Sequence, residues 1–103
     1  MDTKTKLKID ETLQTWKISH EKKEKYTTGH LLTGETPPGH DAFEMFLAFD
    51  DEKRAWLQYQ LVNAEANEGI YRGKTIEYLE NEIKILDKKI YAWKNRQFPS
   101  QAI

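Results

Sequence analysis

The feature that most constrains this chain is an apolar stripe near its C-terminus, which repeats at intervals of three and four residues. The stripe consists of Ile76, Leu79, Ile83, Leu86, Ile90 and Trp93. This spacing places the side chains on one side of an α-helix, as in a coiled coil, and a contact with another helix hides that side from water. Gly73 precedes the stripe, and Lys94, Arg96 and Pro99 follow it, which is typical of helix boundaries. The sequence therefore predicts a helix over residues 74–96 with one packed face.

A second helix is predicted over residues 41–64. Asp41 follows two prolines and a glycine and can cap its N-terminus, and strong helix formers dominate the rest. The large apolar side chains occupy two opposite sides of a helical wheel. One side holds Phe43, Phe46, Leu47, Leu57 and Leu61, and the other holds Met45, Phe49, Trp56 and Tyr59. Because both sides must be buried, we expect this helix to lie between two neighbours.

Three further stretches set the connections. Asp50 and Asp51 interrupt the apolar run and could break the second helix, although we expect it to continue. The connector 67–73 is short and contains two glycines, which favours antiparallel helices on either side of it. Residues 27–40 contain three glycines and two prolines and are predicted to form a loop or linker. A disordered tail is expected over residues 97–103.

The N-terminal third allows two interpretations. Ile9, Leu13 and Trp16 have helical spacing, and a run of lysine and glutamate that follows them favours a helix. Trp16 and Ile18 also alternate with polar neighbours, so a β-hairpin through residues 13–32 is the alternative. We favour the helix.

Length and composition indicate one domain. The chain has 103 residues, of which 12% are aromatic, enough for one modest core. We predict a single all-α domain over residues 1–103, a small bundle built on the antiparallel pair 41–64 and 74–96 with an N-terminal helix added. A domain of this size often gains stability from a second copy, so a homodimer is expected. No segment has the length and apolarity of a membrane span, and cysteine is absent, so we expect a cytoplasmic protein without a membrane partner.

The net charge of −1 hides an uneven distribution. Residues 1–26 carry a net +2, residues 27–70 carry −6 and residues 71–103 carry +3. An acidic middle between two basic ends favours internal pairing of oppositely charged helices. It makes nucleic acid a less expected partner than protein, since a nucleic-acid-binding domain is usually basic overall.

No arrangement typical of catalysis or metal binding is found in the sequence. The three histidines, His20, His30 and His40, lie ten residues apart, which matches no metal-binding motif. The two serines, Ser19 and Ser100, lack the surroundings of a nucleophile. We therefore predict no enzyme activity, no cofactor and no metal, and interpret the histidines as surface residues.

Apolar faces without a chemical site favour a non-catalytic protein–protein interaction module. Tyr78, Ile85 and Ala92 form a second stripe on the last helix, which needs a further layer. We expect the N-terminal segment to cover it, with a second subunit or a target protein as the alternatives. Three acidic residues of the second helix could imitate phosphates, although a solvated helix face is the more ordinary interpretation.

The predicted partner-binding residues are Asp50, Asp51, Glu52, Trp56, Tyr59, Tyr78 and Ile85. Small domains of this composition are frequent among accessory proteins of phages and mobile elements, so a protein that inhibits or modulates a host protein is our first hypothesis, by association only. The alternative is a small nucleic-acid-binding regulator that uses its basic N- and C-terminal segments. Those segments contain Lys22, Lys23 and Lys25 at one end and Lys84, Lys88, Lys89, Lys94 and Arg96 at the other.

Overall fold

The computed structural model describes residues 2–98. Within this range the elements are α1 (Thr3–Lys23), α2 (Thr28–Thr33), α3 (Ala42–Ala66), β1 (Ile70–Tyr71), β2 (Lys74–Thr75) and α4 (Ile76–Lys94). The predicted all-α class is confirmed, since the two strands form only a small antiparallel hairpin. Residues 99–103 of the predicted tail lie outside the described residues.

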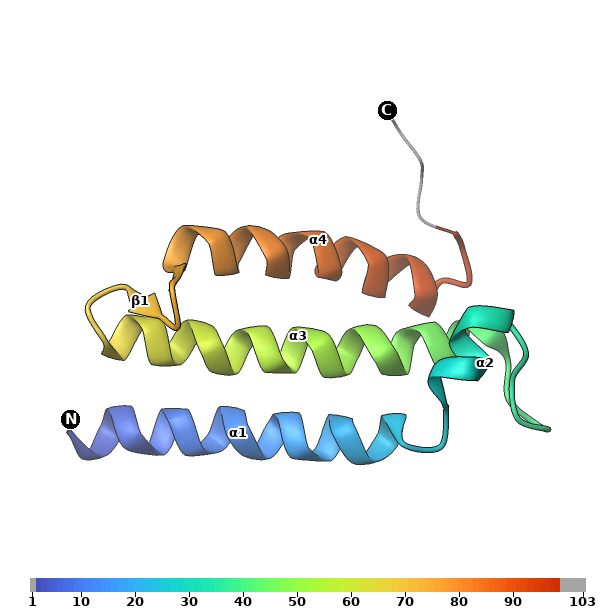
Figure 1. Ribbon diagram of the computed structural model, residues 1–103, viewed down its shortest axis with the longest axis horizontal. Coiled ribbons are helices and arrows are strands. Elements are labelled where there is room, and N and C mark those ends of the chain that lie inside the picture. The colour runs from blue at the N-terminus through green and yellow to red at the C-terminus, as the bar shows by residue number, and fades with distance from the viewer. Residues whose placement is uncertain (1, 99–103) are drawn as a thin grey trace.

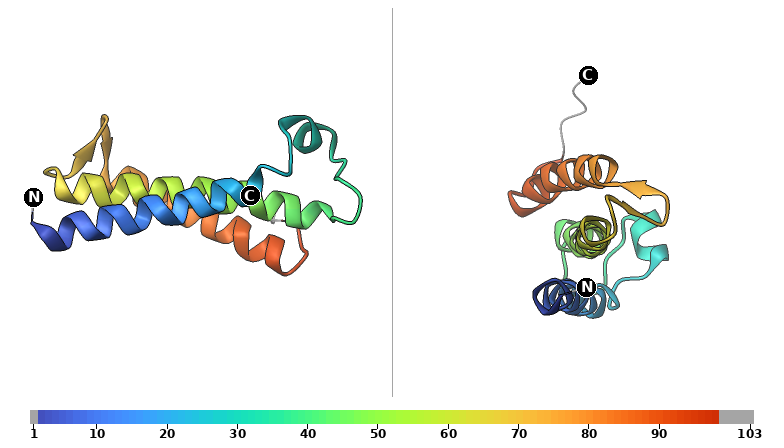
Figure 2. Two further views of the ribbon diagram at one scale, coloured as in Figure 1. Left: turned by 90° about the horizontal axis from the view of Figure 1, so that it is seen from below. Right: turned by 90° about the vertical axis from the view of Figure 1, so that its left-hand side faces the viewer.

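The three long helices lie side by side in one layer, with α3 in the middle (Figure 1). The end-on view in Figure 2 shows the same order of α4, α3 and α1. α1 packs on one side of α3 and α4 on the other. α3 runs without a break past Asp50 and Asp51. The two predictions for this segment, a continuous helix and a position between two neighbours, are therefore confirmed.

The apolar core lies between α3 and α4. It is a cluster of six residues, Leu57, Leu61, Ala64, Leu79, Ile83 and Leu86. Leu79 is completely buried, and Ile90 continues the buried face of α4 toward the C-terminus. Ile76 and Trp93, at the two ends of the stripe, are half-buried. The stripe is thus hidden in a helix–helix contact, as predicted, and the pair is antiparallel (Figure 1).

Side-chain caps fix where α3 and α4 begin. The Asp41 carboxylate accepts a hydrogen bond from the Glu44 backbone N–H at 2.8 Å. The Thr75 hydroxyl accepts one from the Tyr78 backbone N–H at 3.2 Å. Each cap satisfies a donor that a helix leaves free in its first turn. α4 therefore starts at Ile76, two residues later than predicted.

The connector before α4 contains the hairpin that the sequence analysis did not anticipate. β1 and β2 pair through Ile70 with Thr75 and Tyr71 with Lys74. Arg72 and Gly73 form the turn, with φ values of 50° and 81°. Two residues with positive φ match the twist of a two-residue hairpin, but arginine is rare there, which is why the sequence did not indicate it.

Residues 28–33, predicted as part of a loop, instead form α2. The Thr27 hydroxyl accepts from the His30 backbone N–H, and the Thr27 backbone N–H donates to His30 Nδ1, both at 3.1 Å. This reciprocal arrangement is a capping box in which histidine takes the usual place of glutamate. Gly34, with a φ of 77°, ends the helix. The glycine content misled the prediction because Gly34 is a helix terminator rather than part of a long loop.

The N-terminal third is helical over Thr3–Lys23, so the alternative hairpin through residues 13–32 is wrong. The side of α1 that faces α3 contains Ile9, Leu13 and Trp16 at helical spacing, all half-buried. No residue of α1 is fully buried. The prediction that this segment covers the second stripe of α4 is also wrong, because α1 packs on the side of α3 opposite α4 (Figure 1). None of the helices within residues 2–98 is long and apolar enough to cross a membrane.

Leu79→Ala tests the α3–α4 core. We expect the free energy of unfolding to fall by about 2–5 kcal/mol, because the substitution leaves a cavity at a site with no solvent access. Urea denaturation followed by circular dichroism measures the loss. Tyr91→Ala, at a residue of the same helix that is 69% exposed, is the control and should change stability by less than about 0.5 kcal/mol. Equal effects of the two substitutions would contradict this location of the core.

Candidate functional site

The acidic run on α3, predicted to contact a partner, points in three directions. Asp50 accepts a hydrogen bond from Trp93 Nε1 on α4. Glu52 faces α1, and Asp51 lies between these two directions, in a groove beside α1. Successive residues of a helix are about 100° apart, so three in a row cannot share one face. The three carboxylates therefore do not form a single acidic surface.

Glu52 is the main polar anchor of α1 on α3. Its carboxylate is 2.6 Å from Lys23 Nζ and accepts a hydrogen bond of 3.4 Å from Trp16 Nε1. His20 Nδ1 lies 3.8 Å away, and the His20 ring stacks on Trp16. Because the Glu52 side chain is only 17% exposed, water screens these contacts less than it would on an open surface. A polar cluster thus holds α1 in place where α4 uses leucine and isoleucine.

A groove of about 790 Å³ runs between α1 and α3. Its α1 wall carries small hydroxyl side chains together with Ile18 and Lys22, and its α3 wall carries small, apolar and charged side chains. The lining includes Thr12, Thr15, Ile18 and Ser19 of α1 and Leu47, Ala48, Asp51 and Ala55 of α3. The short side chains among them leave space between the two helices, and the groove stays open there. Tyr26 and His40 line it as well, and both belong to the connecting segments between α1 and α3.

Asp51 is a titratable group in this groove whose pKa is shifted. Burial raises the pKa of its carboxyl above the ordinary value. Lys94 and Lys22 lower the pKa and Asp50 raises it, but burial is the largest influence. The folded protein therefore holds a proton on Asp51 up to a higher pH than the unfolded chain does.

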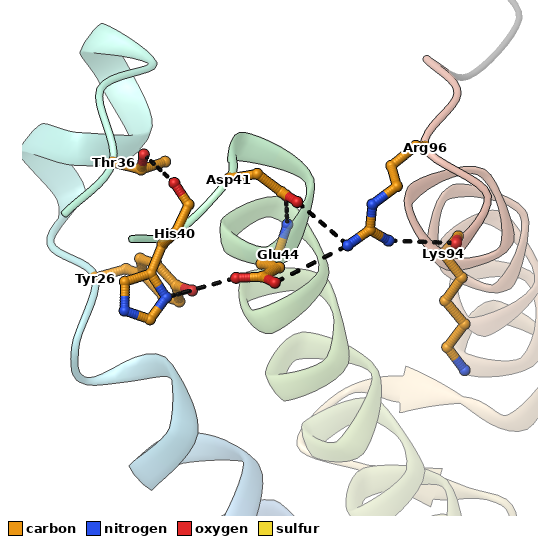
Figure 3. A network of polar contacts seen from close by, with 7 residues as sticks. All are labelled: Tyr26, Thr36, His40, Asp41, Glu44, Lys94 and Arg96. Carbon is orange, nitrogen blue, oxygen red and sulfur yellow. Dashed lines mark hydrogen bonds and ion pairs between the residues drawn. The ribbon is translucent and has the colours of Figure 1, made fainter. Parts of the chain in front are cut away.

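A network of polar contacts joins three segments at the end of the layer where α3 begins (Figure 3). The Tyr26 hydroxyl and His40 Nδ1 are 3.1 Å apart, and His40 Nδ1 is 3.5 Å from Glu44. The Arg96 guanidinium lies 3.2 Å from the Asp41 carboxylate. The Glu44 N–H, with Arg96 nearby, holds the pKa of Asp41 below its ordinary value. Here the basic C-terminal segment pairs with the acidic start of α3, as the charge distribution predicts.

Tyr26 is buried although it lies in a connecting segment. It is 4% exposed, and its ring packs edge-on against that of His40 with centroids 5.5 Å apart. Burial raises the pKa of the Tyr26 hydroxyl, with Glu44 and Asp41 adding to the rise. Sequence analysis missed this residue, because nothing in its neighbours indicates that the chain folds back onto it.

Trp56 and Tyr59 belong to a row of aromatic side chains. Trp56 contacts Trp16 of α1 with centroids 5.0 Å apart, and it stacks on Tyr59 at 5.3 Å. Tyr59 meets Tyr71 of the hairpin edge-on at 6.3 Å, and the Arg72 guanidinium lies over Tyr71. All four aromatic residues are half-buried. The row links α1, α3 and the hairpin, so these two predicted partner residues also hold the fold together.

Tyr78 and Ile85 are the predicted site residues that remain open. They are 50% and 52% exposed on α4. Ala92, the third member of their stripe, is only 8% exposed and lies beside the turn that ends α4. The structure therefore separates the predicted site into internal contacts of α3 and an exposed stripe on α4.

Each histidine has a local role. His20 stacks on Trp16, His30 caps α2, and His40 contacts Tyr26. Within residues 2–98, no group of three potential ligand side chains is placed to hold a metal ion.

Comparison of the chain with protein-family models, curated proteins and solved structures finds no match.

Asp50→Ala tests whether this carboxylate is structural. The substitution removes the acceptor of the Trp93 N–H in a half-buried site, so we expect a loss of about 1–3 kcal/mol in the free energy of unfolding. Asp87→Ala is the control, because it removes an ion pair with Arg54 whose side chains are 50% and 36% exposed, worth about 0–1 kcal/mol. Urea denaturation compares the two. A fully stable Asp50→Ala protein would indicate that Asp50 is free for another role.

Asp51→Asn tests the groove electrostatics. Because the folded-state pKa is raised, the wild-type protein loses stability as the pH rises from the unfolded value of 3.8 through the folded one. A neutral side chain avoids that loss, so Asp51→Asn should raise the melting temperature at pH 7 and lose this advantage below pH 3.8. Calorimetry over this pH range measures the difference. An advantage that is constant with pH would show that the charge of Asp51 is not its cause.

Proposed function

We propose that this protein is a non-catalytic binding module whose α1/α3 groove receives a segment of another protein. The observation that carries the proposal is the open layer of helices, with a groove of about 790 Å³ beside the central one. In a closed bundle, a further helix lies against two others and buries the space between them. A helix or loop of a partner can take that place here.

The groove offers apolar contacts and charges of both signs. Ile18, 46% exposed, and Leu47 give a partner apolar surface to cover, and burial of such surface drives association. Lys22, Lys25 and Arg54 also line the groove, together with Glu44 and Asp51. Charges of both signs fix the orientation of a bound segment rather than adding much affinity.

A module that covers part of another protein inhibits or modulates it. We propose this role, as found in accessory proteins of phages and mobile elements, on the basis of size and composition, which is an argument by association. The cysteine-free sequence suits the reducing cytoplasm, where we place the partner.

Nucleic acid is the weaker candidate because part of the basic charge is paired internally. Lys23 contacts Glu52, and Arg96 contacts Asp41 and Glu44. Affinity for nucleic acid comes largely from cations that neutralise phosphates. Cations that are already paired within the protein contribute less to the affinity for nucleic acid.

The test compares three forms of the full chain as baits in a nuclease-treated lysate of the source organism: wild type, Ile18→Glu and Tyr91→Glu. Ile18→Glu places a charge in the groove, whereas Tyr91→Glu places the same charge at an exposed site on α4. We expect a protein that wild type and Tyr91→Glu retain and that Ile18→Glu retains at least about tenfold less, since a charge left in a buried contact costs several kcal/mol. Circular dichroism establishes that all three are folded.

Two outcomes contradict the proposal. One is a set of retained proteins that is identical for the three baits, which would exclude the groove as the binding site. The other is salt-sensitive binding of wild type to generic DNA, measured by fluorescence anisotropy, without any groove-dependent protein. That result would favour the nucleic-acid-binding regulator.

A further inference from the structure

The exposed side of α4 is a second surface, separate from the groove. Tyr78 and Ile85 are half-exposed there, seven residues apart, which places them on one line along the helix. α1 and α3 do not cover this line, because α4 packs on α3 through its opposite side (Figure 2). Lys88 and Lys89 are exposed beside it, and Glu82 is half-buried.

The sequence along this line is self-complementary about Ile85. Successive residues of a helix are about 100° apart, so Glu82, three residues before Ile85, and Lys89, four residues after it, lie on the same side of the line. An antiparallel pair with a twofold axis at Ile85 brings residues of the same side together, and would therefore place Glu82 opposite Lys89 of a second copy.

We propose that this face of α4 binds the same face of a second copy of the chain, in an antiparallel pair with Ile85 at the twofold axis. Ile85 packs on its counterpart at the centre, and two symmetry-related Glu82–Lys89 contacts lie on either side of it along the helices. Closed twofold interfaces of this kind use one surface patch twice. The inference does not rest on the proposed function, because the α1/α3 groove stays free in such a dimer.

The charges select the antiparallel orientation. A parallel pair would bring Lys89 of each copy against Lys88 of the other, because these two residues lie on opposite sides of the line, and like charges placed together cost several kcal/mol. In the antiparallel pair, Glu82 meets positive charge. Within residues 2–98, Glu82 and Lys89 form no ion pair, so they are available for these contacts.

The dimer is expected to depend on concentration. Two helices in contact form an interface at the small end of the range for specific complexes, so association is weaker than in an obligate dimer. The packed seam of α4 on α3 is already used within the chain and takes no part in the dimer.

Cysteine cross-linking tests the position of the axis, since the chain has no cysteine of its own. A disulfide forms only between Cα atoms less than about 7 Å apart, which Ile85→Cys satisfies at the axis. In the antiparallel pair, two copies of residue 78 are 14 residues apart along the helices, about 21 Å. Mild oxidation should therefore give a covalent dimer for Ile85→Cys and none for Tyr78→Cys or for the control Tyr91→Cys. Cross-linking of Tyr78→Cys as well as Ile85→Cys would indicate a parallel pair and overturn the proposal.

Charge reversal tests the same contact without touching its apolar centre. Glu82→Lys should raise the dissociation constant, measured by sedimentation equilibrium, at least about tenfold, because lysine would meet lysine at both ends of the interface. The double substitution Glu82→Lys and Lys89→Glu restores opposite charges and should restore the dimer. Glu80→Lys, the same change at an exposed position on another side of α4, is the matched control.

The sedimentation data also decide the proposal as a whole. Wild-type protein that remains monomeric up to its solubility limit would overturn it. So would a dimer that Glu82→Lys and Glu80→Lys weaken equally. Neither result bears on the α1/α3 groove, which the Ile18→Glu variant tests separately.

Discussion

The burial of α3 on two opposite sides is the constraint on which the structure depends. α4 covers one side through leucine and isoleucine contacts that exclude water. α1 covers the other through Glu52, Lys23 and Trp16, with no fully buried residue of its own. The two interfaces of α3 therefore differ: the one with α4 is apolar, and the one with α1 combines polar, aromatic and half-buried apolar contacts. The outer sides of α1 and α4 remain uncovered.

Local sequence signals predicted the three long helices. The roles of side chains that contact distant segments of the chain could not be predicted in this way. The stripe from Ile76 to Trp93 was sufficient for α4, because its spacing is itself the helical period. α2 was missed, since its start depends on a histidine side chain that replaces the usual glutamate at the cap. The roles of Asp50 and Glu52 could not be predicted from the sequence, because their partners, Trp93 and Trp16, lie 43 and 36 residues away in the chain.

The exposed residues form two surfaces that are independent of each other. The groove lies between α1 and α3, and the stripe of Tyr78 and Ile85 lies on the far side of α4. α3 separates them, so occupation of one leaves the other accessible (Figure 2). A dimer formed through α4 would carry two grooves and present them together, which raises the effective affinity for a partner that has two matching sites.

The way α1 is held has a consequence for local motion. Proteins open in cooperative units whose free energies follow the apolar contacts that each unit buries. α1 buries no residue fully, whereas α3 and α4 share a continuous core, so we expect α1 to open at a lower free energy than the α3–α4 pair. Amide hydrogens of α1 should then exchange with solvent faster than those of the α3–α4 pair. Since α1 forms one wall of the groove, the shape of the groove follows the opening and closing of this single helix.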